Sequence, residues 1–551
     1  MSGPTGQKPP ARFELPARFN LGRWLLDANL DAGRGEKIAL RWRDESHTYA
    51  QLVDASDRLA AAFRDLGLRP EERVLIAAPD RPEWCHAWFA TLKAGGVFAM
   101  VNTLLTEEDY DYYLGYSRAA IAVVDESLAP VFARLAPRHP WLRAVVVMGG
   151  ETSTSRPNHV DGQHLLVDLI EQAPGPLAPF DSHKHDLCGW LFTSGSTGHP
   201  KAAVHFHEDF AFNIERYALG VLGIREDDVT SGVPKLFFGY ATGNNLMFPF
   251  RAGGSTALFS ERSTPEALLA HIERYRPTIL TSVPTMIGRM LELDAEREQA
   301  GEPRYDLSSL RLVTSAGEKL PDPLHRRWLD RFGVEILDGI GSAELFHVYI
   351  SNRPGAVRFG SLGQAVPGYD CRVVDDAGSA LPPGSIGRLH VRGESAALCY
   401  WQDHEKSKDT FAGDLVISGD LFRRDDEGYF FYEGRADDLL KVGGVWVAPH
   451  EIEECLLAHP DIEQAAVVGW LDADKLVKPK AFVVLGDGLA ATLRDDAAGG
   501  RAEVDAVLTG WCKDHLAPYK YPRAYEYLDD LPRNDRGKVD RKALKARQET
   551  A

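Results

Sequence analysis

The sequence predicts an α/β fold, with a large N-terminal domain of parallel sheets covered by helices and a small α+β domain after it. Three observations predict this fold. Short apolar runs alternate with longer amphipathic stretches over most of the chain, the pattern becomes rich in short strands and turns after about residue 365, and helices and strands mix in the last part. The length of 551 residues also favours more than one domain, since single cores stop growing near ~250–300 residues.

Alternation of apolar runs and amphipathic stretches defines the large domain. "RVLIAAP" (73–79) predicts a buried strand, and "PEWCHAWFATLKAGG" (82–96) predicts a helix that two glycines end. Further strands are predicted at 97–102, 119–127, 142–149, 276–284, 310–318 and 334–344. Ligands of such folds bind beyond the carboxyl ends of strands, so the segments "TSAGE" (314–318) and "DGIGSAE" (338–344) are predicted to be site loops.

The pattern of predicted secondary structure changes twice toward the C-terminus. From about 365 to 434, segments such as "YDCRVVDDAGSALPPGSIGRLHVRGE" combine short strands with turn signals and predict a β-rich subdomain. Beyond it we expect a helix in "APHEIEECLLAHP", strands in "QAAVVGW" and "KAFVVLG", and a helix over 501–515. The predicted boundaries are therefore 1–434 for the large domain and 435–551 for the small one.

Charge and cysteine content narrow the possible partners. A formal net charge of −18 argues against nucleic-acid binding, which needs a basic surface, and against docking on anionic lipid. The six cysteines are scattered and form no CxxC pair, which predicts free thiols in a reducing cytosol. The N-terminus lacks an apolar signal core and no run of ~18 apolar residues occurs, so a cytoplasmic protein without membrane spans is expected.

A short loop, "TSGSTGHPK" (193–201), is rich in glycine and hydroxyl residues and contains a lysine. Backbone N–H groups of such a turn can converge on an anion, and the hydroxyls add donors, so the loop predicts a phosphate site. Its spacing is not that of the Walker P-loop. The residues concerned are Thr193, Ser194, Gly195, Ser196, Thr197, Gly198 and Lys201.

This loop and four later strings together resemble the acyl-adenylate-forming superfamily, which includes acyl- and aryl-CoA synthetases, peptide-synthetase adenylation domains and luciferase. The later strings are "GSAE" (341–344), "SGD" (418–420), "EGRADDLLKVGG" (433–444) and "LPRNDRGKVDRKAL" (531–544), and all five stand in the family's order. The resemblance implies two reactions at one carboxyl carbon. A carboxylate first attacks the α-phosphorus of ATP and expels pyrophosphate, and the thiol of coenzyme A then displaces AMP.

The resemblance also implies roles for the residues of these strings. Glu344 would help to hold Mg²⁺ beside the phosphates, Asp420 would accept both ribose hydroxyls, and Arg435 would lie near ribose or phosphate. Ala343 departs from the family's usual Thr and removes one donor, which Ser342 or the loop hydroxyls could replace. The residues expected around adenine are Gly317, Glu318, Asp338, Gly339 and Ile340.

Lys538 is the residue that the resemblance assigns to the first transition state, where a cation meets developing negative charge. By the same resemblance Asp437 is the pivot about which the small domain rotates between the two half-reactions. That rotation would remove Lys538 and bring Lys441, Gly443 and Gly444 to the site. The two glycines carry no side chains, so a narrow tunnel for the pantetheine arm of coenzyme A could pass them.

The acid is expected to be aromatic. "PKLFFGYATGNNLMFPF" (234–250), "GSAELFHVYISNRPGAVRFGSLGQAVPGYDCRVVD" (341–375) and "LLKVGGVWVAPHEIE" (439–453) resemble the corresponding segments of benzoate-CoA ligases. The implied substrate is benzoate or an amino- or hydroxybenzoate. Two roles stay open for His347, contact with the ring or its substituent and capping of a helix. The expected pocket residues are Phe237, Tyr240, Ala241, Gly339 and His347.

Other functions stay open at this point. An adenylation enzyme that loads a carrier-protein thiol would share the first half-reaction, although the chain shows no carrier segment of its own. A nucleotide-binding regulatory protein that has lost catalysis is disfavoured because Lys538, Glu344, Asp420 and Arg435 are all present. A homodimer is one open oligomeric state.

Overall fold

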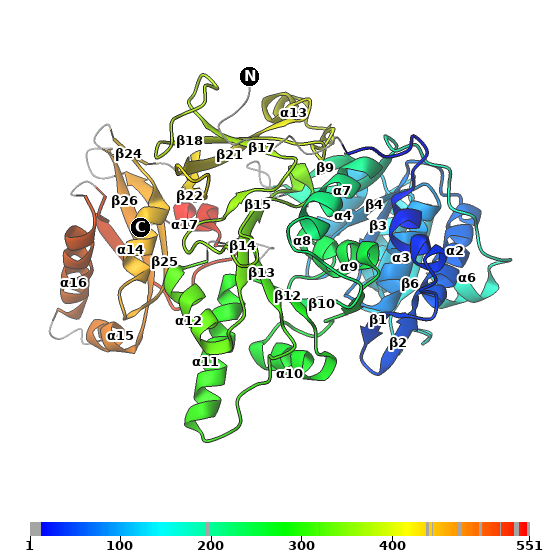
Figure 1. The fold of residues 1–551 in the computed structure, drawn as a ribbon, viewed down its shortest axis with the longest axis horizontal. Helices are drawn as coiled ribbons and strands as arrows, with labels where there is room; N and C mark the ends of the chain where they lie inside the picture. Colours follow the sequence, from blue (N-terminus) through cyan, green and yellow to red (C-terminus); the bar gives the residue numbers. More distant parts are fainter. Residues whose placement is uncertain are drawn as a thin grey trace. The chain divides into compact units, whose positions relative to one another are not determined.

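The computed structural model describes residues 13–193, 199–318, 320–436, 440–442, 445–471, 476–494, 499–517, 520–533 and 539–547 (Figure 1). The chain divides into two compact units. Unit 1 comprises Met1–Cys371, His390–Ile417 and Gly428–Phe430, and unit 2 comprises Arg372–Leu389, Ser418–Glu427 and Phe431–Ala551. The domain boundary expected at residues 434 and 435 stays a prediction.

The predicted α/β fold is confirmed, and the predicted strands of the large domain are present. One sheet of unit 1 has eight strands in the order β19-β9-β8-β4-β3-β5-β6-β7. Its central strands are parallel, whereas β8 and β9 pair antiparallel. The strands are β3 (Arg73–Ala77), β4 (Val97–Met100), β5 (Ile121–Asp125), β6 (Ala144–Met148), β7 (His164–Leu165), β8 (Leu187–Thr193), β9 (Lys201–Phe206) and β19 (Cys399–Tyr400).

A second sheet of unit 1 has nine strands in the order β16-β15-β14-β13-β12-β10-β11-β1-β2. It is parallel from β14 to β1, and antiparallel pairs extend it at both ends, so the predicted parallel sheets are in fact mixed. The strands are β1 (Ile38–Trp42), β2 (Glu45–Thr48), β10 (Val229–Gly232), β11 (Ser255–Ala257), β12 (Ile279–Ser282), β13 (Leu312–Ser315), β14 (Ile336–Gly341), β15 (Val348–Ser351) and β16 (Gln364–Ala365).

Local sequence signals set the starts and ends of the helices in unit 1. Thr48 and Thr106 each form a capping box at the start of α2 and α4, and Gly333 ends α12 in the left-handed conformation. The helices of four or more residues are α1 (Ala28–Asp31), α2 (Tyr49–Asp65), α3 (Pro82–Lys93), α4 (Glu107–Ser117), α5 (Ala129–Leu135), α6 (Leu166–Gln172), α7 (His207–Asn213), α8 (Gly239–Thr242), α9 (Phe248–Ala252), α10 (Pro265–Tyr275), α11 (Pro284–Gln299), α12 (Asp322–Phe332) and α13 (His404–Thr410). Three π-helical turns add η1 (Arg23–Asp27), η4 (Ile214–Leu219) and η5 (Gly243–Met247).

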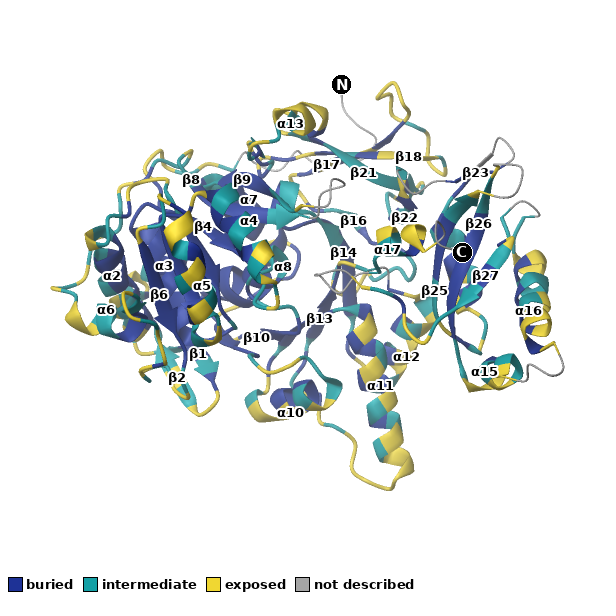
Figure 2. Ribbon diagram, turned by 180° about the vertical axis from the view of Figure 1, so that it is seen from behind, coloured by how far each residue is buried: buried dark blue, intermediate teal, exposed yellow. Residues whose placement is uncertain are grey.

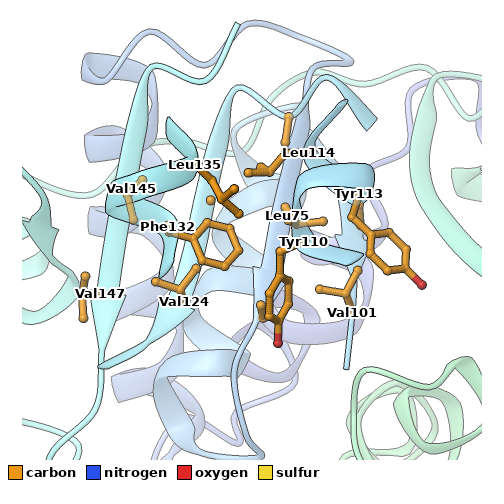
Figure 3. Close-up of a cluster of buried hydrophobic side chains, with 14 of the residues drawn as sticks. Leu75, Val101, Tyr110, Tyr113, Leu114, Val124, Phe132, Leu135, Val145 and Val147 are labelled. Atoms are coloured by element: carbon orange, nitrogen blue, oxygen red, sulfur yellow. The ribbon is translucent and has the colours of Figure 1, made fainter. Parts of the chain in front are cut away.

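Each sheet of unit 1 buries an apolar face against helices. Side chains from β3, β5 and β6 meet those of α4 and α5 in one cluster, where the rings of Tyr110 and Phe132 lie 5.2 Å apart (Figure 3). Leu280, Val313 and Ile336 on neighbouring strands of the other sheet pack against α10, α11 and α12. The strands are buried while the outward faces of α10 and α11 are exposed (Figure 2). Burial of apolar surface contributes about 25 cal/mol per Å² to folding stability. The contacts between these faces and the helices therefore stabilise the sheets that carry the predicted site loops.

Unit 2 contains the small domain and confirms its predicted elements. An antiparallel pair, β25 (Ile462–Leu471) and β26 (Val477–Leu485), continues to a parallel β27 (Ala524–Tyr527). A second pair joins β23 (Leu440–Val442) to β24 (Val445–Val447). The helices are α14 (Pro449–Leu457), α15 (Asp487–Arg494), α16 (Gly500–His515) and α17 (Arg541–Ala546).

Short strands follow one another in the region predicted to be β-rich, β17 (Asp370–Val374), β18 (Ile386–Arg392), β20 (Phe411–Ala412), β21 (Leu415–Arg424) and β22 (Phe430–Arg435). All six cysteines fall within the described ranges and carry free thiols, as predicted. Among the helices of those ranges, none is long and apolar enough to span a bilayer.

Candidate active site

The stem of the predicted phosphate loop is a strand pair. Thr193 ends β8 and Lys201 begins β9, and the two residues are paired across the antiparallel ladder. Tyr112 of α4 supports the second strand, because its hydroxyl donates to the Pro200 carbonyl at 2.8 Å and its ring stacks on His199 at 4.7 Å. Ser194, Ser196, Thr197 and the glycines 195 and 198 lie outside the described residues. No motif in the sequence singled out Tyr112, which contacts the two residues that precede β9.

Tyr400 connects the loop lysine to the GSAE turn. Its hydroxyl donates to Oε1 of Glu344 at 2.6 Å, and Nζ of Lys201 lies 4.3 Å from the centre of its ring. Such a charge-assisted hydrogen bond fixes the direction of the carboxylate. The structure therefore brings Lys201 and Glu344, two of the predicted phosphate-side residues, onto one aromatic side chain that sequence reasoning missed.

A buried histidine holds the backbone of the same turn. Nε2 of His205 lies 2.7 Å from the carbonyl oxygen of Ala343, and its Nδ1 lies 2.9 Å from Oδ2 of Asp209. Since a carbonyl only accepts, Nε2 donates, and Asp209 orients the ring. The turn is thus fixed at the carbonyl of Ala343, one residue before Glu344, whatever side chain position 343 carries.

The two loops predicted to flank adenine follow neighbouring strands. Ser315 of β13 is paired with Asp338 of β14, so "TSAGE" and "DGIGSAE" leave the same edge of the sheet. Gly317 adopts a φ of +93°, a conformation that favours glycine, and Oε2 of Glu318 accepts from the Thr285 hydroxyl at 3.1 Å. This edge is where ligands of open α/β sheets bind.

Of the predicted acid-binding residues, Tyr240 and His347 are in contact, and Gly243 lies against the His347 ring. We call Phe237, Tyr240, Ala241, Gly243 and His347 the acid wall. Nε2 of His347 lies 3.0 Å from the carbonyl oxygen of Tyr240, which stands in the short helix α8. The ring is 2% exposed and lies 4.7 Å from the ring of Phe248. His347 follows the 3-10 turn of Ala343–Leu345, and its side chain binds Tyr240 instead of capping that turn.

Burial determines the charge of the acid wall. It lowers the pKa of His347 to about 3 and raises the pKa of Tyr240 well above its usual value. Both side chains are therefore neutral near pH 7. Ala241 is fully buried, and Gly339 lies within β14, where an added Cβ would come within 2.8 Å of the Ile350 carbonyl oxygen. The wall is neutral and largely aromatic, a surface that suits an uncharged ring.

Asp80 is another residue that sequence reasoning missed. It follows β3, and its Oδ1 accepts from the backbone N–H of Leu236 at 2.8 Å, at the start of the segment that leads into α8. Thr242 holds the same segment from the other end, since its hydroxyl lies 2.5 Å from the Leu236 carbonyl oxygen. Burial raises the pKa of Asp80 to about 6. An aspartate after a strand carried no motif from which this contact could be predicted.

Two predicted nucleotide residues lie together in unit 2. Oδ1 of Asp420 and Nη1 of Arg435 are 3.6 Å apart, on β21 and β22. An added Cβ at Gly419 would lie 2.7 Å from Nη2 of Arg435, so the glycine leaves room for the guanidinium. Lys441 lies on β23, whereas Asp437, Gly443, Gly444 and Lys538 lie outside the described residues.

The chain belongs to the AMP-binding enzyme family. The profile of that family matches residues 27–401, and the profile described as the AMP-binding enzyme C-terminal domain matches residues 451–538. The first match includes residues 193–201, 314–318 and 338–344, and the second lies within the predicted small domain.

Particular relatives are similar over nearly their whole length. Benzoate–CoA ligase of Thauera aromatica is 42% identical over 542 residues, which are 98% of each chain. The 4-hydroxybenzoate–CoA/benzoate–CoA ligase of Rhodopseudomonas palustris is 34% identical, over 96% of this chain and 95% of its own. The structure of the anthranilate CoA ligase AuaEII in complex with anthranoyl-AMP matches with a TM-score of 0.87 and 37% identity, over 97% of this chain and 98% of that one.

Proposed function

We propose that the protein is an AMP-forming aryl-CoA ligase, which converts an aromatic carboxylate, ATP and coenzyme A into the aryl-CoA thioester, AMP and pyrophosphate. The observation that carries this proposal is the neutral acid wall around Tyr240 and His347, at the carboxyl edge of a sheet whose loops match the AMP-binding family. The relatives named above, which act on benzoate, hydroxybenzoate and anthranilate, support an aromatic acid of this size.

In the first half-reaction a carboxylate oxygen of the acid attacks the α-phosphorus of ATP, and the bond to pyrophosphate breaks. Lys201 and the loop of residues 193–198 would hold the phosphates, and Asp420 with Arg435 would hold the ribose. Lys538 would meet the charge that develops in the transition state. In the second half-reaction the coenzyme A sulfur attacks the acyl carbon and releases AMP, with Lys441, Gly443 and Gly444 near the pantetheine arm and Asp437 as pivot.

Glu344 is the side chain proposed to hold Mg²⁺. Its Oε1 is fixed by Tyr400, and the carboxylate stands in a turn fixed by His205. The described residues contain no cluster of three or more His, Cys, Asp and Glu side chains placed for a metal. This fits a Mg²⁺ ion held by one carboxylate and the phosphates, since Mg²⁺ keeps several waters and substrate oxygens as ligands. The ion would neutralise phosphate charge during attack.

The experiment is an assay of pyrophosphate release with a panel of acids, with and without coenzyme A. We expect release with benzoate, 2-aminobenzoate or 4-hydroxybenzoate, and a thioester only when coenzyme A is added. A higher kcat/KM for dodecanoate than for every aromatic acid would overturn the aromatic assignment. Thioester formation on a carrier protein but not on coenzyme A would favour the alternative of a carrier-loading adenylation enzyme. The homodimer stays a prediction.

A further inference from the structure

Two tyrosines of α4 contact the stem of the predicted phosphate loop. Tyr112 and Tyr116 are about one helical turn apart, so their side chains lie on the same face of the helix, and their rings stack at 5.4 Å with an angle of 17° between the planes. The ring of Tyr112 stacks in turn on the exposed ring of His199 at 4.7 Å. A continuous stack of rings therefore runs from α4 to the residue two positions before Lys201.

The two tyrosine hydroxyls hold the backbone on both sides of Lys201. The Tyr112 hydroxyl donates to the Pro200 carbonyl at 2.8 Å, and the Ala202 N–H donates to the Tyr116 hydroxyl at 3.2 Å. Burial raises the pKa of Tyr116 to about 12 and raises the pKa of Tyr112 as well, so both hydroxyls keep the proton that they donate. Lys201 itself is paired with the last residue of β8. The backbone is thus fixed before, at and after the lysine.

Tyr116 also connects β9 to the segment beside it. Trp401 stands one residue beyond β19, and its N–H donates to the Ala202 carbonyl at 2.9 Å. A hydrogen-bonded pair of an antiparallel ladder exchanges two such bonds. Here the return bond passes through the tyrosine, because its hydroxyl accepts from the Ala202 N–H and donates to the Trp401 carbonyl at 2.5 Å. The indole Nε1 of Trp401 donates to the Tyr116 carbonyl at 3.1 Å and fixes the helix at the same place.

The Tyr116 hydroxyl therefore joins the two segments on which the charged groups depend. Lys201 begins β9, and Tyr400 is the last residue of β19. The Tyr400 hydroxyl donates to Glu344 at 2.6 Å, and its ring lies 4.3 Å from Nζ of Lys201. A shift of one segment against the other would change the distance between the lysine and the carboxylate. A misplacement of about 1 Å can lower a rate by on the order of 10²-fold.

We propose that Tyr112 and Tyr116 are positioning residues for ATP, which hold Lys201 at the distance from Glu344 that the phosphates and Mg²⁺ require. This inference rests on the proposed function for the roles of Lys201 and Glu344, and it deepens that function. The tyrosines act through the backbone of residues 199–202 and through Trp401. Their substitution should therefore weaken the binding and reaction of ATP and leave the binding of the acid unchanged.

The first test separates the two substrates. The dissociation constant of MgATP is measured by calorimetry without acid, and the KM values of ATP and of benzoate are measured by pyrophosphate release. Tyr116→Phe keeps the ring and removes both hydrogen bonds of the hydroxyl, so it should weaken MgATP binding by roughly ten- to a hundredfold. Tyr112→Phe removes one bond and should weaken it by about two- to tenfold. The KM for benzoate should change by less than about twofold in both variants.

Tyr110→Phe is the matched control on the same helix. The Tyr110 hydroxyl donates to the Asn102 carbonyl at 2.9 Å, and its ring belongs to the core cluster of α4 (Figure 3). We expect this variant to lose melting temperature as the other two do and to keep the wild-type dissociation constant for MgATP. A loss of MgATP binding equal to that of Tyr116→Phe would show that any damage to α4 has this effect, and would overturn the inference.

His199 gives a test that does not disturb the core, because its ring is exposed. His199→Ala removes the outer ring of the stack and should weaken MgATP binding by about two- to tenfold. His199→Phe keeps a ring on Tyr112 and should bind MgATP within about twofold of the wild type. Equal losses in the two variants would mean that the imidazole acts on ATP by itself and that the stack does not position the loop.

A double variant tests the connection to Glu344. Tyr116→Phe and Tyr400→Phe disturb the same two segments, so their effects should not be independent. The fall in kcat/KM for ATP in the double variant should be clearly smaller than the product of the two single falls. A fall equal to that product would show that Tyr116 does not act on the geometry that Tyr400 fixes.

The inference is overturned if folded Tyr116→Phe and Tyr112→Phe both bind MgATP as the wild type does. An equal rise in the KM for benzoate would overturn it too, because a positioning role for ATP predicts a change in one substrate only. If Tyr116→Phe fails to fold, Tyr112→Phe and His199→Ala decide the question by the same measurements. Absence of pyrophosphate release with every aromatic acid would refute the proposed function, whereas MgATP binding without acid still tests the two tyrosines.

Discussion

His347 of the acid wall in unit 1 is 2% exposed, whereas the side chains of Asp420 and Arg435 in unit 2 are 19% and 51% exposed. The histidine follows a strained turn at Phe346, where φ is +67°, and is held by a glycine-sized space at Gly243 and one hydrogen bond to Tyr240. The pair in unit 2 is an ion pair at 3.6 Å, of a kind that contributes ~0–1 kcal/mol to stability.

This difference shows how the two kinds of site residue are tied to folding. Substitution of a side chain that is buried among aromatic rings disturbs their packing and lowers stability. Substrate specificity and stability are therefore coupled in the acid wall. Partly exposed charged side chains contribute little to the free energy of unfolding, so their removal should change stability little. We therefore expect variants of the nucleotide and thiol residues to change rates at constant stability, and variants of the acid wall and its supports to change both.

Lys538→Ala should have the largest effect on the rate, and it tests whether a nucleotide-side residue changes the rate without changing stability. Loss of one preorganised charge should lower the rate of adenylation by on the order of 10²–10³. The melting temperature should stay at the wild-type value. Pre-made aryl-adenylate with coenzyme A should still give thioester at nearly the wild-type rate, because Lys538 is expected at the site only in the first half-reaction. An equal fall in both half-reactions would refute the two-conformation assignment.

Gly444→Leu should affect the other half-reaction. A side chain at this position would block the path of the pantetheine arm without reaching the phosphates, so enzyme-bound adenylate should accumulate in a quenched reaction with ATP and acid. The control is Gly510→Leu on α16, where an added Cβ meets no atom within 4 Å. Steady-state thioester formation at the wild-type rate in Gly444→Leu would show that no tunnel passes this residue.

Tyr400→Phe tests the support of Glu344, the carboxylate proposed to hold Mg²⁺, in unit 1. It removes the 2.6 Å hydrogen bond to Glu344 and keeps the ring that lies beneath Lys201. Hydrogen bonds to charged groups contribute about 1.5–3 kcal/mol, so pyrophosphate release should fall by about ten- to a hundredfold. The fall should be steepest at limiting Mg²⁺. Because Tyr400 is 5% exposed, some stability should be lost too. Full activity at limiting Mg²⁺ would mean that Tyr400 does not orient Glu344.

The sequence predicted the strands that carry the site, because β3, β12, β13 and β14 are apolar runs bounded by turn signals. It also predicted that Tyr240 and His347 belong to one acid site, through the resemblance of their segments. Their contact could not be derived from periodicity, since the two residues are more than a hundred positions apart and only tertiary packing joins them.

The residues that hold the site segments in place could not be predicted from the sequence. Tyr400, His205 and Asp80 act through single side-chain contacts with the backbone or carboxylate of a site segment, and such contacts leave no pattern in the chain. The antiparallel ends of both sheets were missed for a similar reason, because a short apolar run does not specify the direction of its partner. Strain at Phe346 is likewise visible only in the backbone angles.

Asp80→Asn should have the smallest effect on catalysis. Lys538→Ala is expected to lower the rate and leave stability unchanged, whereas Asp80→Asn should change stability and leave the rate nearly unchanged. The folded-state pKa of Asp80 is about 6, raised by burial, against ~3.9 for an unperturbed aspartate. The folded state therefore binds the proton more tightly, and this carboxylate lowers stability progressively as pH rises from about 4 to about 6, by up to ~3 kcal/mol above that range.

Asparagine keeps an oxygen that can accept from the Leu236 N–H and has no proton to lose. Asp80→Asn should thus gain stability relative to wild type as pH rises from 4.5 to 8, so that the free energy of unfolding of the variant minus that of wild type increases, while the KM for the acid changes less than about threefold. Urea unfolding of both proteins at the two pH values measures this difference. Lys235, whose charge lowers the pKa of Asp80, limits the effect, so Lys235→Met in the wild-type background should enlarge the pH dependence. If the difference in free energy of unfolding between the two proteins does not change with pH, Asp80 is ionised across this range. Burial then does not raise its pKa, although its Oδ1 still accepts from the Leu236 N–H at 2.8 Å.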